Sequence, residues 1–312
     1  MQKTVLSFGE TLWDLYPSGP VLGGAPFNFA CRIHSLGDRG IIVTRVGRDE
    51  LGSKALERIA ELGMEVSCVQ KDDQRPTATV QVMLDASGNP DFVVAPEVAS
   101  DCIDLTYELL ELAATADCFC FGTLAQRTES SRRTLHRLLE VATKGVKCLD
   151  INLRKNCYFE ETITYSIEKA DILKMNLHEA HYLADLFEVS ISSLPDFCAE
   201  IMEEWSLACC LVTLGEHGAF AATRAEKVYA PGYEVSVVDT CGAGDAFSAA
   251  FVHEYLRGKS LSDCCRLGNA LGAIVATQKG ATTPVGIEEV HQFLNAKRRR
   301  VHESSLKPFE VV

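Results

Sequence analysis

The sequence has no apolar run near the roughly 18 residues that a membrane-spanning helix requires. The apolar run near the N-terminus, Val5–Phe8, is too short for the core of a secretory signal peptide. Basic residues are also few, because 30 Lys and Arg stand against 43 Asp and Glu in 312 residues, for a net charge of −13. Nucleic-acid binding requires clustered cations. We therefore expect neither a nucleic acid nor a membrane as a partner.

The sequence also lacks the C-x-x-C spacing of metal and redox sites, although it has 13 cysteines. Their number is odd, and several lie in apolar runs, such as Cys118 with Cys120 and Cys209 with Cys210. Disulfides belong to oxidising compartments, whereas free cysteine behaves as a small buried apolar residue. The pattern predicts reduced, buried thiols and a cytoplasmic protein.

Three familiar site motifs are missing as well. The Walker pattern G-x-x-x-x-G-K-[ST] does not occur. Gly242-x-Gly244-x-x-Phe247 lacks the third glycine of a dinucleotide fingerprint and lies near the C-terminus rather than after the first strand. His178-Glu179-Ala180-His181 does not have the H-E-x-x-H spacing of a zinc site. These absences argue against P-loop, dinucleotide-binding and zinc-hydrolase chemistry.

Short apolar runs alternate with helical patterns along most of the chain. Strands are expected at 4–8, 40–46, 118–122, 147–151, 171–175 and 208–213, and helices at 26–36, 51–62, 105–114, 130–143, 179–187, 195–205, 243–257, 261–278 and 287–300. Strand–helix alternation predicts an α/β fold with a doubly wound, mostly parallel sheet and helices on both faces. The basic run 297–300 is expected to be the solvated end of the last helix.

Two segments break this alternation. At about 11–17 and 76–95, apolar and polar residues alternate as in strands, with a turn expected at Ser87-Gly88-Asn89-Pro90. Strands inserted in this way can form a small sheet that serves as a lid. No linker or internal repeat divides the chain, so residues 1–312 are expected to form one domain.

The stretch Val238–Phe247 carries the strongest chemical signal. Gly242, Ala243 and Gly244 place backbone N–H groups at the start of a helix, where unpaired donors and the helix dipole favour an anion. Asp245 stands beside this anion site. A carboxylate there makes sense if it accepts a proton from an attacking hydroxyl while the amides hold a phosphoryl group. The alternative is an ordinary acidic residue in a first helical turn.

A second glycine turn opens an earlier helix. Gly23 and Gly24 precede Pro26, which suits the first helical turn, and Asn28 follows one turn in, where its amide can both donate and accept hydrogen bonds. Asp14 lies upstream in an otherwise apolar strand and could accept two sugar hydroxyls. The alternative is a plain turn with Asn28 on a solvated face.

Taken together, these motifs resemble a known family. Gly-Gly-x-x-x-Asn-x-Ala at 23–30, Gly47-Arg48-Asp49-Glu50-Leu51-Gly52, and the Asp239–Asp245 segment occur in the order seen in ribokinase-like carbohydrate kinases, the phosphofructokinase B family. The resemblance covers essentially the whole chain. It implies a doubly wound α/β domain with a small β-sheet lid.

The resemblance also implies roles for individual residues. It makes Asp245 the catalytic base and the amides of Gly242, Ala243 and Gly244 the anion hole. Sugar hydroxyls would be bound by Asp14, Gly23, Gly24 and Asn28. The nucleotide would be bound by Asn176, Thr213, Gly215, Gly218 and Asn269. Glu179 would serve Mg²⁺ indirectly, and Asp239 would help to hold K⁺.

Three features are similar to fructokinases within this family. They are Gly9-Glu10-x-x-x-Asp14, the Gly23–Asn28 turn, and Asp150-Ile151-Asn152-Leu153-Arg154, in which Ile151 replaces a frequent proline. Arg154 would be a cation near the substrate or the phosphate, or else a structural arginine. The resemblance implies transfer of the ATP γ-phosphoryl group, with Mg²⁺, to a primary hydroxyl of a free ketose such as fructose. A homodimer formed through the lid is a further expectation. The alternatives are a 2-keto-3-deoxygluconate kinase, a nucleoside kinase, and a non-catalytic binding relative.

Overall fold

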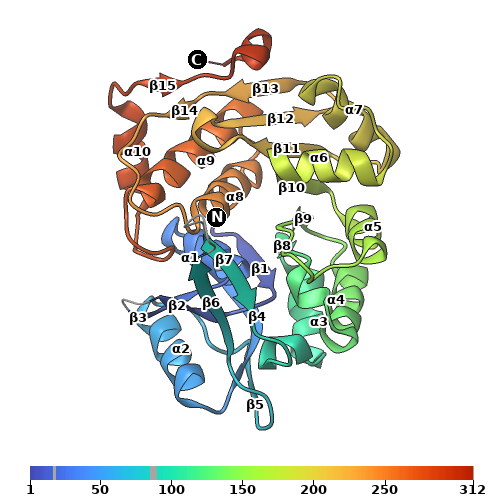
Figure 1. The fold of residues 1–312 in the computed structure, drawn as a ribbon, viewed down its shortest axis with the longest axis vertical. Helices are drawn as coiled ribbons and strands as arrows, with labels where there is room; N and C mark the ends of the chain where they lie inside the picture. The colour runs from blue at the N-terminus through green and yellow to red at the C-terminus, as the bar shows by residue number, and fades with distance from the viewer. Residues whose placement is uncertain (17–18, 85–89, 312) are drawn as a thin grey trace.

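A nine-stranded sheet forms the centre of the computed structural model, which describes residues 1–16, 19–84 and 90–311, with side chains described outside 82–93. The strand order is β13-β12-β11-β10-β9-β8-β1-β4-β5, and in Figure 1 it runs from β13 at the top to β5 at the bottom. The strands are β1 (Thr4–Phe8), β4 (Arg39–Gly47), β5 (Val69–Asp72), β8 (Cys118–Phe121), β9 (Val146–Asp150), β10 (Ile172–Asn176), β11 (Cys209–Thr213), β12 (Ala219–Thr223) and β13 (Lys227–Ala230). Every pair is parallel except β11–β12 and β12–β13 at one edge.

Helices cover both faces of this sheet. One face carries α1 (Ala25–Ser35), α2 (Glu50–Glu61), α8 (Ala243–Tyr255) and α9 (Leu261–Ala276), with α10 (Ile287–Asn295) packed outside α9. The other carries α3 (Tyr107–Thr115), α4 (Glu129–Val141), α5 (Glu160–Lys169), α6 (Leu177–Leu186) and α7 (Leu194–Glu204). Short 3-10 helices are η1 (Ala99–Cys102), η2 (Leu124–Gln126), η3 (Gly215–His217) and η4 (Ser304–Phe309). The predicted doubly wound α/β fold is confirmed.

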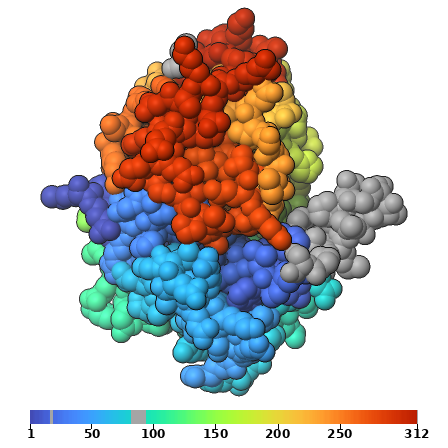
Figure 2. Space-filling view, turned by 90° about the vertical axis from the view of Figure 1, so that its left-hand side faces the viewer, coloured from blue at the N-terminus to red at the C-terminus, as the bar shows by residue number. Residues whose placement is uncertain are grey.

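Residues from both ends of the chain share one core. Phe29 of α1 packs with Phe247 and Phe251 of α8 against one face of the sheet. Figure 2 shows the same union on the surface, where the C-terminal part, in orange and red, rests on the N-terminal part, in blue. The contact matters for the site because it brings the first residues of α1 and α8 together.

A separate four-stranded sheet has the order β3-β2-β6-β7 and lies in the lower left half of Figure 1. It consists of β2 (Leu12–Tyr16), β3 (Gly19–Gly23), β6 (Ala78–Leu84) and β7 (Pro90–Val94). Strands β2, β6 and β7 come from the two segments that were expected to form lid strands. Strand β3 was not predicted, because its sequence Gly-Pro-Val-Leu-Gly is typical of a loop. Residues 87–89 of the expected turn lie outside the described residues.

The Gly47–Gly52 motif anchors this small sheet to the main domain. Asp49 begins α2 by accepting a hydrogen bond from the Gly52 amide at 2.7 Å. The same carboxylate accepts from the amide and the hydroxyl of Thr77, each at 2.7 Å, one residue before β6 begins. The Thr77 hydroxyl is also the acceptor for the Gly47 amide at 2.9 Å. A family motif with no evident chemistry therefore fixes the base of a strand in the small sheet.

The expectation for the basic run was wrong. Helix α10 ends at Asn295, and Arg300–Val301 form β15, which pairs antiparallel with β14 (Gly232–Tyr233). The Arg300 guanidinium lies 3.7 Å from the centre of the Tyr233 ring, and that of Arg298 lies 3.9 Å from the Phe293 ring. Stacking on aromatic rings, rather than a helix dipole, holds these cations.

The cysteine prediction agrees with the structure. All thirteen cysteines lie in the described part of the chain and are free thiols, and ten of them are buried. Among the described residues, no helix is both long enough and apolar enough to cross a membrane.

Candidate active site

The candidate site lies where parallel strands end at the middle of the large sheet. From β1 the chain proceeds to β4 and β5 on one side, whereas β8 to β11 follow on the other. Ligands of open α/β sheets bind at such a reversal, beyond the carboxyl ends of the strands. A cleft of about 480 Å³ occupies this position. Its lining includes ten residues singled out from the sequence, namely Asp14, Gly24, Asn28, Arg154, Asn176, Thr213, Asp239, Gly242, Gly244 and Asp245.

The first turn of α8 forms one wall of the cleft. Gly242 precedes the helix in a left-handed conformation with φ 76°, and a Cβ atom there would lie 2.4 Å from the Cβ of Ala281. Only glycine fits this position. The Ala243 amide donates to the carbonyl of Thr240 at 3.2 Å, whereas the amides of Gly242 and Gly244 have no acceptor in the described chain. Together with the Asp245 amide, which also has no acceptor in the described chain, these two glycine amides are the donors that the turn leaves available to an anion.

Asp245 follows directly and is held by Asn28. The Asn28 side-chain amide donates to Asp245 Oδ2 at 2.8 Å, which joins residues 217 positions apart. Burial, together with the charge of Asp150, raises the pKa of Asp245 to about 6, although Asn28, Lys174 and Arg154 act in the opposite direction. A carboxylate with such a pKa is ionised at neutral pH yet more basic than an ordinary aspartate, as general base catalysis requires.

The sugar-binding candidates surround this pair. Asn28 Oδ1 is buried and has no hydrogen-bond partner among the described residues. A Cβ atom on Gly23 would lie 3.0 Å from Asp14 Oδ2 and 3.9 Å from Asn28 Oδ1, so both polar groups face the bare backbone of Gly23. Gly24 brings its backbone so near to Glu10 that a Cβ atom would lie 2.6 Å from the Glu10 carbonyl oxygen. An unpaired amide oxygen beside a carboxylate is a good acceptor pair for hydroxyl groups.

Glu10 lines the cleft, although the sequence analysis gave it no role. Its side chain is buried, and this burial raises its pKa to about 7, despite the opposing charge of Arg154. Asp14 behaves similarly, because burial raises its pKa to about 6 and Arg154 opposes the change. Arg154 itself is exposed. The cleft thus holds three carboxyl groups that are easier to protonate than usual.

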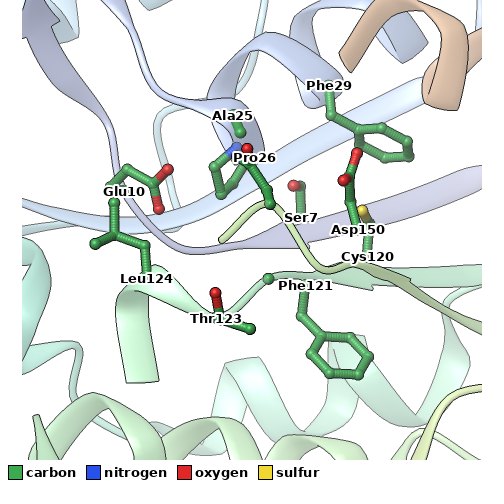
Figure 3. A pocket seen from close by; sticks show the side chains of 12 residues that line it. Ser7, Glu10, Ala25, Pro26, Phe29, Cys120, Phe121, Thr123, Leu124 and Asp150 are labelled. Atoms are coloured by element: carbon green, nitrogen blue, oxygen red, sulfur yellow. The ribbon is translucent and has the colours of Figure 1, made fainter. Parts of the chain in front are cut away.

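A smaller cavity, drawn in Figure 3, shares Glu10, Ala25, Leu124 and Asn152 with the lining of the cleft. Ser7, Glu10 and Asp150 line it, with Pro26 and Phe29 of α1 above and Thr123 and Leu124 below. Its volume of about 20 Å³ is room for about one water molecule. The Ser7 hydroxyl is buried without a partner in the described part of the chain, so a water molecule there would satisfy it.

The nucleotide candidates are more spread out. Asn176 and Thr213 line the cleft at the ends of β10 and β11. Gly215 is the first residue of η3 and Gly218 follows its end, with φ angles of 60° and 91°, and neither residue lines the cleft. Asn269 is buried in α9 and donates to the carbonyls of Ala230 and Pro231 at 2.8 and 3.3 Å. The structure therefore brings two of the five candidates into the cleft.

Glu179 and Asp239 bind backbone amides. The Glu179 carboxylate accepts from the amides of Leu153 and Asn176 at 2.9 and 2.8 Å, so both of its oxygens are engaged inside the protein. Asp239 accepts from the amides of Cys241 and Gly280 at 2.9 and 3.1 Å and joins the α8 turn to the loop after α9. The described residues contain no group of three or more His, Cys, Asp or Glu side chains suited to a metal ion. A divalent ion carried by nucleotide phosphates and water needs only one or two protein carboxylates.

Lys174 is the main residue that the sequence analysis missed. It lies within β10, is 6% exposed, and lines the cleft. Its ammonium donates to Asp150 Oδ1 at 3.0 Å. A lysine inside an otherwise apolar strand, two residues before Asn176, was a signal that could have identified it.

Known structures share this architecture. The fructokinase of Xylella fastidiosa, solved with bound ATP, superposes with a TM-score of 0.83 at 23% identity, over 94% of this chain and 98% of that one. The fructokinase of Vibrio cholerae O395 in its fructose-, ADP- and calcium-bound form gives 0.81 at 24%, over 94% and 99%. The 2-dehydro-3-deoxygluconokinase of Thermotoga maritima gives 0.83 at 19%, over 95% and 100%. The fold is therefore that of ribokinase-like sugar kinases.

Sequence comparison gives the family. A model described as pfkB family carbohydrate kinase matches residues 20–287. The probable fructokinase-3 of Arabidopsis thaliana is 30% identical over 327 aligned residues, which cover 96% of this chain and 93% of that protein. Fructokinase-1 of Oryza sativa subsp. japonica is 31% identical over 308, with 89% and 93% covered. The chain belongs to the pfkB family of carbohydrate kinases, and the resemblance found in the sequence is confirmed.

Proposed function

We propose that this protein is an ATP-dependent fructokinase, which transfers the γ-phosphoryl group of ATP to a primary hydroxyl of free fructose. The observation that carries the proposal is the hydrogen bond between Asn28 and Asp245 at the start of α8, which lies in the cleft. The chain that forms this cleft matches a carbohydrate kinase family. Fructokinases among the relatives, at about 30% identity over most of the chain, support the choice of sugar.

In the proposed mechanism, Asp245 accepts the proton of the attacking hydroxyl. The amides of Gly242 and Gly244 stabilise the negative charge on the transferred group, whereas the Ala243 amide, expected from the sequence in the same role, is engaged by the Thr240 carbonyl. Asn28 orients Asp245 through its amide and offers its free oxygen to a sugar hydroxyl. Asp14, Gly23 and Gly24 complete the sugar side of the cleft.

In the proposed mechanism, the nucleotide binds at the ends of β10 and β11. Asn176 and Thr213 lie at the cleft, while Gly215, Gly218 and Asn269 shape the adjoining loops. Mg²⁺ would neutralise charge on the nucleotide phosphates, and Glu179 would act on it indirectly by holding Asn176. Asp239, which joins the α8 turn to the loop at Gly280, is the candidate for holding K⁺ beside the anion site.

The proposal treats residues 1–312 as one functional unit, with the small sheet as a lid over the sugar. Its strands β2 and β6 place Leu12, Asp14 and Val80 on the lining of the cleft. Dimerisation through this sheet and a cytoplasmic location remain predictions of the sequence.

The charge of the cleft favours a neutral sugar over an acidic one. Glu10, Asp14 and Asp245 stand near the expected sugar position, and the cations Arg154 and Lys174 line the same cleft, with Lys174 already paired with Asp150. The carboxylate of 2-keto-3-deoxygluconate would meet repulsion from these groups, whereas fructose brings only hydroxyls. The acidic sugar remains the second candidate, because the guanidinium of Arg154 matches a carboxylate in geometry and charge.

The test is a coupled assay of ADP release with ATP, Mg²⁺ and K⁺. The panel contains fructose, 2-keto-3-deoxygluconate, ribose and adenosine. We expect the highest kcat/KM with fructose. Turnover of 2-keto-3-deoxygluconate but not fructose would overturn the sugar assignment, and no turnover with any acceptor would overturn the kinase itself.

A further inference from the structure

Lys174 offers the cleft a buried positive charge with unused hydrogen-bond donors. Its ammonium has three N–H groups, and Asp150 Oδ1 at 3.0 Å is the one acceptor that the described residues supply. The side chain is 6% exposed but lines the cleft. A buried ammonium needs acceptors, so the remaining donors are suited to a ligand in the cleft.

The surrounding residues fix this ammonium beside the anion site. Asp150 Oδ2 accepts from the Ser248 hydroxyl at 2.9 Å, and that hydroxyl also lies 3.0 Å from the Gly244 carbonyl, its second acceptor. A Cβ atom on Gly244 would lie 3.4 Å from Lys174 Nζ. The start of α8 therefore supplies the free amides, and Ser248 in its second turn positions the ammonium through Asp150.

Lys174 remains charged in this environment. Burial lowers its pKa, but the carboxylates of Asp150, Glu179 and Asp245 outweigh burial and leave the pKa above its ordinary value. Arg154, the cation expected from the sequence, is exposed, whereas Lys174 is buried and hydrogen-bonded to Asp150. Of the two cations at the cleft, Lys174 is the one that the fold holds in place.

We propose that Lys174 is a catalytic residue that donates hydrogen bonds to the phosphoryl group during its transfer. The inference rests on the proposed kinase function. In that step the sugar oxygen forms a bond to the γ-phosphorus and the bond from this phosphorus to the bridging oxygen of ADP breaks. The sugar proton passes to Asp245, and Lys174 keeps its protons. Charge in this transition state spreads over the equatorial oxygens of the phosphoryl group, where a fixed cation is most effective.

The test compares two variants that avoid a buried unpaired carboxylate. Lys174→Met alone would leave Asp150 without its cation, which destabilises a folded protein. Asp150→Asn is therefore the reference, and Asp150→Asn with Lys174→Met is the test variant. Calorimetry measures the affinity of each for ADP and for a non-hydrolysable β,γ-imido ATP analogue, and the coupled assay gives kcat. Arg154→Met is the matched control, since it removes the other cation of the same cleft.

We expect the double variant to lose about 10²–10³-fold in kcat relative to Asp150→Asn, as loss of one preorganised donor does in other enzymes. Its affinity for the ATP analogue should fall about tenfold, with ADP affinity nearly unchanged, because only the analogue carries the γ-phosphoryl group. Arg154→Met should leave the ratio of the two affinities unchanged.

Equal affinity ratios in the double variant and Asp150→Asn would overturn the inference. An equal loss of affinity for ADP and for the ATP analogue would also overturn the inference, because it would show that Lys174 has only a structural role. If the parent protein phosphorylates no acceptor, the proposed function fails, but the affinity ratio still decides whether Lys174 contacts the γ-phosphoryl group.

Discussion

Asp245→Asn separates two accounts of this residue, because they predict opposite changes in stability. A carboxylate in the first turn of a helix stabilises it by about 0.3–1 kcal/mol, so its loss should lower the melting temperature. A carboxylate held for catalysis in a partly buried cleft has a raised pKa and destabilises the fold when ionised. Asparagine keeps the shape and can still accept the hydrogen bond from Asn28, so the charge is the main change.

The size of the effect follows from the pKa. Burial raises the pKa of Asp245 from 3.8 to about 6. The pKa of Asp245 is higher in the folded than in the unfolded protein, so the protonated side chain favours the folded state over the ionised one. This contribution of Asp245 to the free energy of unfolding is fully present below about pH 4 and is lost as the pH rises through 6. At about 1.4 kcal/mol per pKa unit, the full difference is about 3 kcal/mol at pH 7.5. The cleft opens to water, so we expect Asp245→Asn to gain about 1–3 kcal/mol, or a few degrees in Tm.

The assay is thermal unfolding of both proteins between pH 4 and 8, together with kcat at pH 7.5. Asp245→Asn should be more stable than the parent at pH 7.5, and the gap should close towards pH 4. Its kcat should fall by at least 10²–10⁴-fold, because an amide cannot accept the proton. A variant that is less stable at pH 7.5 and keeps its rate within tenfold would refute the reasoning.

Three further outcomes are expected. The kcat/KM for the sugar should fall about tenfold per pH unit below about 6, since only ionised Asp245 can accept a proton, and a rate flat from pH 7 to 5 would contradict this. Rates in K⁺ should exceed those in a bulky organic cation, and Asp239→Ala should abolish the difference; equal rates in the parent count against a cation site. Thr77→Val should destabilise by about 1–3 kcal/mol, because the Gly47 amide loses its acceptor, and should raise the sugar KM more than it lowers kcat. Unchanged KM would mean that the Asp49 anchor does not govern the small sheet.

The sequence alone was sufficient for the features that are local in the chain. The turn at Gly242–Asp245 combines a left-handed glycine with a helix start, and both properties follow from a few adjacent residues. The alternation of buried strands and helices predicted the layers for the same reason. Helix α5 and strand β5 were missed, because Glu160–Lys169 and Val69–Asp72 are short and rich in polar residues.

The contacts that define the site are not local, and periodicity cannot supply them. Asn28 meets Asp245 only because α1 and α8 share a core on one face of the sheet. Lys174 and Asp150 become neighbours because β9 and β10 pair in register. The strand β15 depends on the pairing of Arg300 with Tyr233, which is far away in the chain, so the local sequence predicts a helix end there instead.

The charges of the cleft explain why an anion-transferring site contains so many acids. Glu10, Asp14 and Asp245 all have raised pKa values, mainly because each carboxyl group is buried in the wall of the cleft. That burial gives Asp245 its basicity, yet an arriving phosphate would raise its pKa further and protonate it. Fixed positive charge must offset this effect. Lys174 and the free amides at the start of α8 stand where they would keep Asp245 ionised, and a cation brought with the nucleotide would act in the same direction. The base and the positive charges are therefore effective only together.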